Sequence, residues 1–185
     1  MGTIHATHAP ASDAELISRW LGGDQRAAGA LVERHAPAVA RFAASLGERE
    51  GVEELVQDTF VRAFASLDGF RSDSALRTWL FTICKRLWLD RRRSERRRRE
   101  DVELGEAHAA TDADALDGLV AEETTARIRA VMTTLSPMQR EVFALRVNEG
   151  MAYEEIAQVV GSTAGSCRVH YHNAVKLIRE RVTDE

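Results

Sequence analysis

The chain has 185 residues with 44% apolar side chains, 6% aromatic side chains and a formal net charge of −4. This length suffices for one medium or two small packed domains, and the apolar content excludes wholesale disorder. Helix-forming Ala, Leu, Arg and Glu dominate, and no stretch alternates apolar and polar residues as a half-buried strand would, so the sequence predicts an all-α fold. No apolar run approaches membrane-spanning length, and the first residues lack the apolar core of a signal peptide, so we expect a cytoplasmic protein with no membrane contact of its own.

The N-terminal part of the chain is predicted to be a short tail followed by two helices. Residues 1–12 are expected to be disordered, and Asp13 is the predicted N-cap of a helix over 14–21. A second helix is predicted over 26–46, where Pro37 should kink the helix or mark a new first turn.

The next segment, residues 52–67, has apolar residues at spacings of three, four and one, which is typical of a helix with one buried face. Glu54, Gln57 and Asp58 lie away from that face. Such a polar row either docks on a partner or is merely solvated. A metal-dependent nuclease would use Glu53, Glu54 and Asp58, but no general base or further ligand accompanies these carboxylates, so no catalytic residue is assigned.

A turn sequence, RSDS at residues 71–74, precedes a long helix predicted over 75–99. Trp79 and Trp88 belong to its apolar stripe and are expected in the core, although aromatic rings near cations also stack on exposed bases. Residues 71–99 carry 11 basic and 3 acidic groups, which is either a solvated helix end or a surface that binds phosphates. The basic residues expected to project away from the stripe are Lys85, Arg86, Arg92 and Arg93.

The basic block is followed by a purely acidic one. Residues 100–126 carry 9 acidic groups and no Lys or Arg, and residues 100–118 have the composition of a flexible acidic linker. The linker would separate a first domain over 13–99 from a second, smaller domain over 119–182. Ser136 followed by proline is a predicted N-cap in this second domain.

The C-terminal segment YEEIAQVVGSTAGSCRVHYHNAVKLI resembles a helix-turn-helix, in which Gly161 can take the left-handed conformation between the helices. A purely structural helical hairpin would share the same period. His170 and His172 are two residues apart and do not share a helix face, so no metal site and no cofactor are predicted. The residues left on the groove side, with Arg suited to guanine and Asn to adenine, are Arg168, Val169, His172 and Asn173.

Three segments occur in the order and spacing of the extracytoplasmic-function (ECF) sigma factors, which are alternative initiation subunits of bacterial RNA polymerase. They are EELVQDTFVRAF, FRSDSALRTWLFTICKRLWLDRRR and LSPMQREVFALRVNEGMAYEEIAQVVG. This resemblance covers residues 26–182. It implies that the first domain, region two, binds core polymerase and the −10 promoter element, and that the second, region four, binds the polymerase flap and the −35 element.

The resemblance also implies roles for individual residues. Those matching positions that contact the clamp helices of the largest polymerase subunit are Glu54, Gln57 and Asp58. The resemblance implies that −10 DNA is bound by a loop that holds a flipped promoter base in a pocket, formed by Ser72, Asp73 and Ser74. It also implies −10 contacts from the following helix, by Lys85, Arg86, Arg92 and Arg93. Those expected to read the −35 element are Arg168, Val169, His172 and Asn173.

Two departures from the family pattern bear on DNA contact. Many members carry asparagine at the position of Arg86, and arginines common in the recognition helix are replaced here by His170 and Asn173, which predicts weaker phosphate contact at the −35 element. The resemblance further implies an anti-sigma factor that occludes both domains. The alternative is a stand-alone helix-turn-helix regulator that binds a palindrome as a dimer, against which the region-two motifs and the acidic linker argue.

Overall fold

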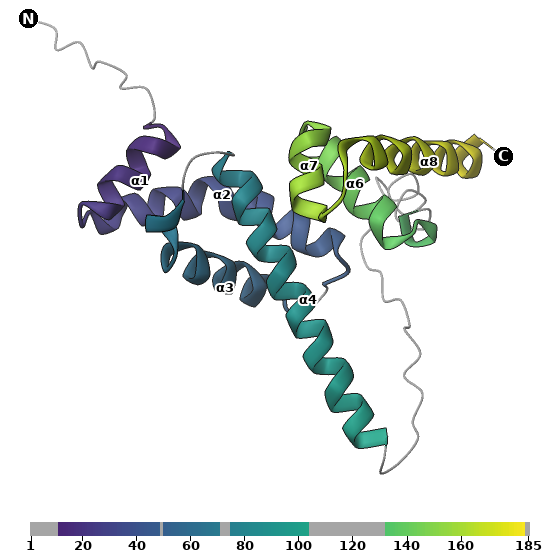
Figure 1. The fold of residues 1–185 in the computed structure, drawn as a ribbon, viewed down its shortest axis with the longest axis horizontal. Helices are drawn as coiled ribbons and strands as arrows, with labels where there is room; N and C mark the ends of the chain where they lie inside the picture. Colours follow the sequence, from purple (N-terminus) through teal and green to yellow (C-terminus); the bar gives the residue numbers. More distant parts are fainter. Residues whose placement is uncertain (1–10, 49, 71–74, 104–131, 184–185) are drawn as a thin grey trace, which may run out of the picture.

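The computed structural model describes residues 11–48, 50–70, 75–103 and 132–183, and no residue in these ranges lies in a strand (Figure 1). This confirms the predicted all-α class. None of the helices in these ranges is long and apolar enough to cross a bilayer. The elements are α1 (Asp13–Leu21), α2 (Gln25–Ser45), α3 (Val52–Phe64), the 3-10 helix η1 (Leu67–Gly69), α4 (Leu76–Glu103), α6 (Pro137–Val147), α7 (Tyr153–Val160) and α8 (Ala164–Thr183).

The predicted N-cap of α1 was wrong by one residue. Ser12 caps the helix, because its side chain accepts from the Glu15 backbone while the Glu15 carboxylate accepts from the Ser12 N–H at 2.7 Å. Asp13 instead accepts from Arg34 at 2.6 Å and contacts His35 Nε2 at 2.9 Å. Partial burial opposes ionisation of Asp13, but these hydrogen bonds hold its pKa below the ordinary value. The carboxylate therefore fastens α1 to α2.

Helix α2 continues through Pro37, so the proline does not begin a new helix there. A proline inside a helix costs about 3 kcal/mol, because it removes a backbone donor and crowds the preceding turn. Leu31, Val39 and Phe42, on both sides of Pro37, are fully buried, and burying each such side chain yields about 1.5–3 kcal/mol. Packing of both halves against one core thus outweighs the cost of the proline.

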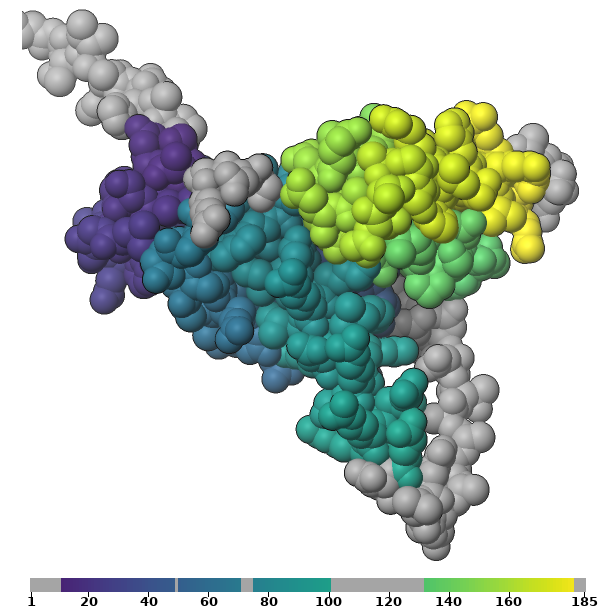
Figure 2. Space-filling model, in the orientation of Figure 1, coloured from purple at the N-terminus to yellow at the C-terminus, as the bar shows by residue number. Residues whose placement is uncertain are grey.

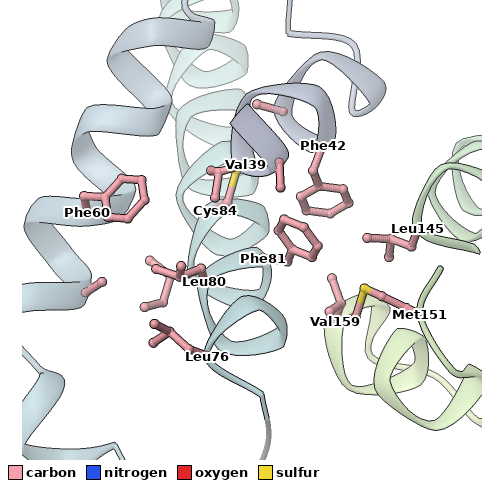
Figure 3. Packing of buried hydrophobic residues seen from close by; sticks show 14 of the residues in the cluster. Val39, Phe42, Phe60, Leu76, Leu80, Phe81, Cys84, Leu145, Met151 and Val159 are labelled. Atoms are coloured by element: carbon pink, nitrogen blue, oxygen red, sulfur yellow. The ribbon is translucent and has the colours of Figure 1, made fainter. Parts of the chain in front are cut away.

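The described helices share one hydrophobic core. We call α1–α4 the N-terminal unit and α6–α8 the C-terminal unit. Figure 3 shows Phe42 and Phe81 of the N-terminal unit facing Leu145, Met151 and Val159 of the C-terminal unit. The Phe42 and Phe81 ring centroids lie 5.0 Å apart, and all five side chains are buried. The two units therefore pack directly against each other.

Helix α4 extends to Glu103, four residues into the predicted linker. Its C-terminal half projects away from the other described helices (Figure 1). Every residue from Arg92 to Glu100 is exposed, and we call this segment the arginine arm. The rest of the predicted linker lies outside the described residues, as do residues 1–10 of the predicted tail.

Candidate functional site

The polar row predicted on α3 forms an exposed stripe. Glu54, Gln57 and Asp58 are all exposed, and Val61, one turn further on, is 64% exposed. Their spacings of three, four and seven residues place all four on one helix face, and we call this face the α3 stripe. Because the opposite face of α3 packs in the core, the stripe is presented rigidly. An exposed valine side chain surrounded by polar groups is typical of a surface that binds another protein.

Arg91 of α4 pairs with two carboxylates of the α3 stripe. Its Nη2 donates to Asp58 Oδ2 at 2.6 Å, and its Nη1 lies 3.4 Å from Glu54 Oε2. Partial burial disfavours the charge on Arg91, but the Asp58 hydrogen bond and the Glu54 charge raise its pKa above the ordinary value. In the sequence Arg91 is only one of the 11 basic groups of residues 71–99, because nothing local links it to a helix 33 residues earlier.

The residues expected to bind −10 DNA fall in three different environments. The predicted base-pocketing loop, Ser72 to Ser74, lies outside the described residues. Arg86, Arg92 and Arg93 are exposed on α4, as expected. The guanidinium of Arg92 lies 5.6 Å from the centre of the partly buried Trp88 ring, an arrangement that leaves its hydrogen-bond donors free to reach a phosphate.

Lys85 does not project into solvent, contrary to prediction. Its side chain is buried between α4 and the C-terminal unit, where Nζ donates to Glu141 Oε2 at 2.5 Å and to the Val160 carbonyl at 3.3 Å. Glu141 is buried as well. The reason is register: Lys85 follows Phe81 by one helical turn, so both side chains face the same neighbour. A lysine enclosed there needs a buried partner.

Two further polar contacts join the same pair of units. Glu149 accepts from Arg41 Nε at 2.9 Å, and its other carboxylate oxygen lies 3.9 Å from Arg77. Thr78 donates to Glu155 at 3.3 Å. Sequence reasoning singled out none of these residues, since each pair is separated by more than seventy positions. Carboxylates of the C-terminal unit thus meet cations and a hydroxyl of the N-terminal unit.

Helices α7 and α8 form the predicted helix-turn-helix. Gly161 has φ 71° and ψ 44°, which confirms the expected left-handed conformation, and its N–H donates to the Ala157 carbonyl at 2.9 Å. Cys167 and Ala174 pack inward from α8. The predicted groove-side residues, which we call the α8 face, are all exposed. They are Arg168, Val169, His172 and Asn173.

The α8 face carries varied chemistry but little positive charge. Arg168 lies over the Tyr153 ring at 5.3 Å and 3.4 Å from Glu154, so α7 orients its guanidinium. Val169 is 58% exposed and offers methyl groups. A guanidinium, methyl groups, an imidazole and a carboxamide are the groups that read base edges in a major groove. Both cysteines are buried free thiols, and the described part of the chain contains no cluster of three or more metal-binding side chains.

Two family models match the chain. The model of sigma-70 region 2 matches residues 31–98, and the model of sigma-70 region 4 matches residues 125–178. Among curated relatives, RNA polymerase sigma factor NccH of Alcaligenes xylosoxydans xylosoxydans is 36% identical over 162 residues, covering 84% of this chain and 86% of the relative. The ECF RNA polymerase sigma factor EcfG of Rhodopseudomonas palustris is 33% identical and covers 75% of each chain.

Solved structures resemble the whole arrangement. CnrH in complex with the cytosolic domain of CnrY gives a TM-score of 0.67 at 30% identity, covering 94% of this chain and 98% of that one. The sigma factor RpoE in complex with the anti-sigma factor NepR from Bartonella quintana also gives 0.67, at 27% identity, with 84% and 96% covered. With both sigma-70 regions matched and relatives above 30% identity, the chain belongs to the ECF group of the sigma-70 family, the RNA polymerase subunits that direct promoter-specific transcription initiation.

Proposed function

We propose that three surfaces of the chain carry out the three binding functions of a sigma factor. The α3 stripe docks on the clamp helices of core polymerase. The exposed side of α4 from Arg86 to Arg93, with the loop at residues 72–74, captures the −10 element, and the α8 face reads the −35 element. The observation that carries this assignment is the exposure of the α3 stripe and the α8 face on separate helices, each anchored from behind by the core.

Neither DNA-binding surface suffices alone in this proposal. The α8 face has one arginine, and a flipped −10 base costs a few kcal/mol of lost stacking, which pocket contacts and stacking offset. Polymerase holds the two surfaces at a fixed separation, so binding of the second promoter element becomes intramolecular, with an effective concentration in the millimolar range for short tethers. Residues 13–99 would act as region two, residues 119–182 as region four, and residues 100–118 as the linker between them.

We also propose that an anti-sigma factor holds this chain in the cytoplasm until it is needed. The support is the likeness, across nearly the whole chain, to sigma factors solved as complexes with CnrY and with the anti-sigma factor NepR. The sequence contributes no sensing chemistry of its own, so a signal would have to act through such a partner.

Run-off transcription with purified core polymerase, followed by mapping of the start sites, tests the proposal. The chain should direct core enzyme to promoters that share two spaced elements, whereas the free chain should retard duplex DNA only weakly in a gel-shift assay. Tight, specific duplex binding without polymerase, together with no directed transcription, would instead favour a stand-alone helix-turn-helix regulator.

A further inference from the structure

We infer that Arg91 of α4 is a positioning residue for polymerase docking: it binds one oxygen of each of two carboxylates on the α3 stripe and leaves the other oxygen for the partner. The two carboxylates belong to Asp58 and Glu54. This inference rests on the proposed function, in which the α3 stripe docks on core polymerase. The group of the partner that fits the remaining oxygens is a cationic side chain.

Helical register directs Arg91 toward α3, unlike the arginines that follow it. Arg91 lies two turns of helix after the buried Cys84, so the two side chains share a face of α4. Cys84 lies against Thr59 of α3. Arg92 and Arg93 lie on other faces and are exposed, and α4 beyond them projects from the body of the molecule (Figure 2). One arginine of the run is therefore committed to α3.

Each carboxylate has acceptor capacity left when Arg91 is bound. Arg91 Nη2 donates to Asp58 Oδ2 at 2.6 Å, and Nη1 lies 3.4 Å from Glu54 Oε2. Among the described residues, no hydrogen bond or ion pair reaches Asp58 Oδ1 or Glu54 Oε1. An ionised carboxylate offers about four lone-pair sites on its two oxygens. Both carboxylates can therefore bind Arg91 and polymerase at the same time.

The ion pairs are covered on the side of the cation and open on the side of the carboxylates. The Arg91 side chain is 24% exposed, whereas the side chains of Asp58 and Glu54 are 49% and 73% exposed. Gly51, directly before α3, leaves room for the guanidinium, because a Cβ atom there would lie 3.3 Å from Arg91 Nη1. A protein that approaches the stripe thus meets carboxylate oxygens before it meets the cation.

Arg91 has two opposing effects on docking. Its positive charge repels a cationic partner, but water and salt screen that repulsion at an exposed surface. Its hydrogen bonds fix two flexible carboxylates before polymerase arrives, so less side-chain entropy is lost when the complex forms. At physiological ionic strength we expect the fixed orientation to outweigh the repulsion, so that removal of Arg91 weakens docking although it makes the stripe more negative.

The experiment compares Arg91→Gln with Arg19→Gln in the full-length chain, by competition binding to core polymerase at an ionic strength of about 0.15 M. The control also removes one arginine from an exposed ion pair, the 2.7 Å contact with Asp24, which lies outside the α3 stripe. We expect Arg91→Gln to lower the affinity about fivefold and Arg19→Gln to leave it unchanged. Unchanged or higher affinity of Arg91→Gln would overturn the inference.

Both variants should keep their thermal stability and their helicity by circular dichroism, because exposed ion pairs contribute little to stability. Arg91→Lys should give an affinity between those of Arg91→Gln and the unmodified chain, because an ammonium keeps the charge but lacks the planar fork that reaches both carboxylates. A Lys variant as weak as the Gln variant would still fit loss of the fork, whereas a Lys variant weaker than Gln would contradict positioning.

A second comparison separates positioning from a purely structural role of Arg91. Arg91→Gln is repeated in a chain that already carries Glu54→Ala and Asp58→Ala. If Arg91 acts through these carboxylates, the substitution should change polymerase affinity less than about 1.5-fold in that chain. A further fivefold loss there would overturn the inference, because the effect of Arg91 would then pass through other contacts.

Failure of the proposed function gives a different pattern. If the α3 stripe is not the docking face, the variant with Glu54→Ala and Asp58→Ala should bind polymerase as tightly as the unmodified chain, and both proposals fall. If the stripe docks but Arg91 does not position it, that variant should lose affinity while Arg91→Gln does not, and only the role of Arg91 is overturned.

Discussion

Arg91 of α4 donates a hydrogen bond from Nη2 to Asp58 Oδ2 across 2.6 Å, so a cation lies at the edge of the exposed α3 stripe. The same guanidinium lies 3.4 Å from Glu54, which fixes two of the three residues expected to contact polymerase. The cation also leaves the stripe less negative than its sequence suggests. Docking on the clamp helices would then depend on carboxylate oxygens held in fixed orientations and on the exposed Val61 side chain, rather than on a diffuse negative potential.

Asp58→Arg combined with Gln57→Ala should therefore reduce affinity for core polymerase by about 100-fold, because it reverses charge at the centre of the stripe and sets a new arginine against Arg91. The stability cost should stay within about 1 kcal/mol, since exposed ion pairs contribute little. Competition binding to core enzyme measures the affinity, and thermal unfolding checks the fold. Glu33→Arg, on an exposed part of α2, is the matched control. Equal affinities of the two variants would exclude the α3 stripe as the docking face.

Arg168→Ala should weaken transcription from promoters that contain the −35 element by about tenfold, because one bidentate contact to a base is worth about 1–3 kcal/mol. Its position over Tyr153 pre-orients the guanidinium, so the loss should appear in promoter affinity more than in later steps. Lys176→Ala, two turns further along α8, is the control. Abortive initiation assays on promoters with and without the element measure the difference. An equal loss on both promoters would mean that Arg168 does not read bases.

Local signals in the sequence predicted most of the helices. Apolar spacing placed α3 within a few residues, and the Ser136 N-cap appears as a capping box with Gln139. Gly161 ends α7 as expected. Each of these features depends on neighbours within one turn of helix, which a sequence displays directly. The exposure of the α3 stripe and the α8 face followed from the same periodicity.

Contacts between distant segments were not predictable in the same way. Pro37 predicted a kink or a new first turn, and packing on both sides of it keeps α2 continuous. Lys85 was assigned to a solvent-facing side, whereas a glutamate 56 residues later encloses it. The helical period identifies the residues that share a face but not the segment that covers that face. Contacts between the N-terminal and C-terminal units therefore could not be predicted from periodicity. The base-pocketing loop, residues 72–74, stays a prediction.

Both thiols should be unreactive in the folded chain. Burial raises the pKa of Cys84 to about 12, although a Thr59 hydrogen bond and the Arg91 charge act in the opposite direction. Burial also raises the pKa of Cys167. At pH 8 the Cys84 thiolate fraction is then about 10⁻⁴, and thiolate is the reactive form. A chromogenic disulfide reagent should titrate neither thiol rapidly in buffer and both in denaturant. Fast reaction of one thiol in native buffer would mean that its surroundings open readily.

The arginine arm gives a prediction about salt. Arg96, Arg97, Arg98 and Arg99 are exposed on a helix that continues beyond the exposed −10 side of α4, and each phosphate contact they make would release counterions. Replacing all four with Gln should lower the slope of log affinity against log salt concentration by up to about 0.9 per lost contact, while Lys at the same positions should retain the slope. Promoter binding by polymerase loaded with each variant, measured across a salt series, tests this.

Gln keeps the helical propensity, so the circular dichroism spectrum of the four-Gln variant should not change. The loss should also be independent of the spacer sequence, since phosphates carry no base information. A slope identical to that of the unmodified chain would mean that the arm is solvated in the promoter complex.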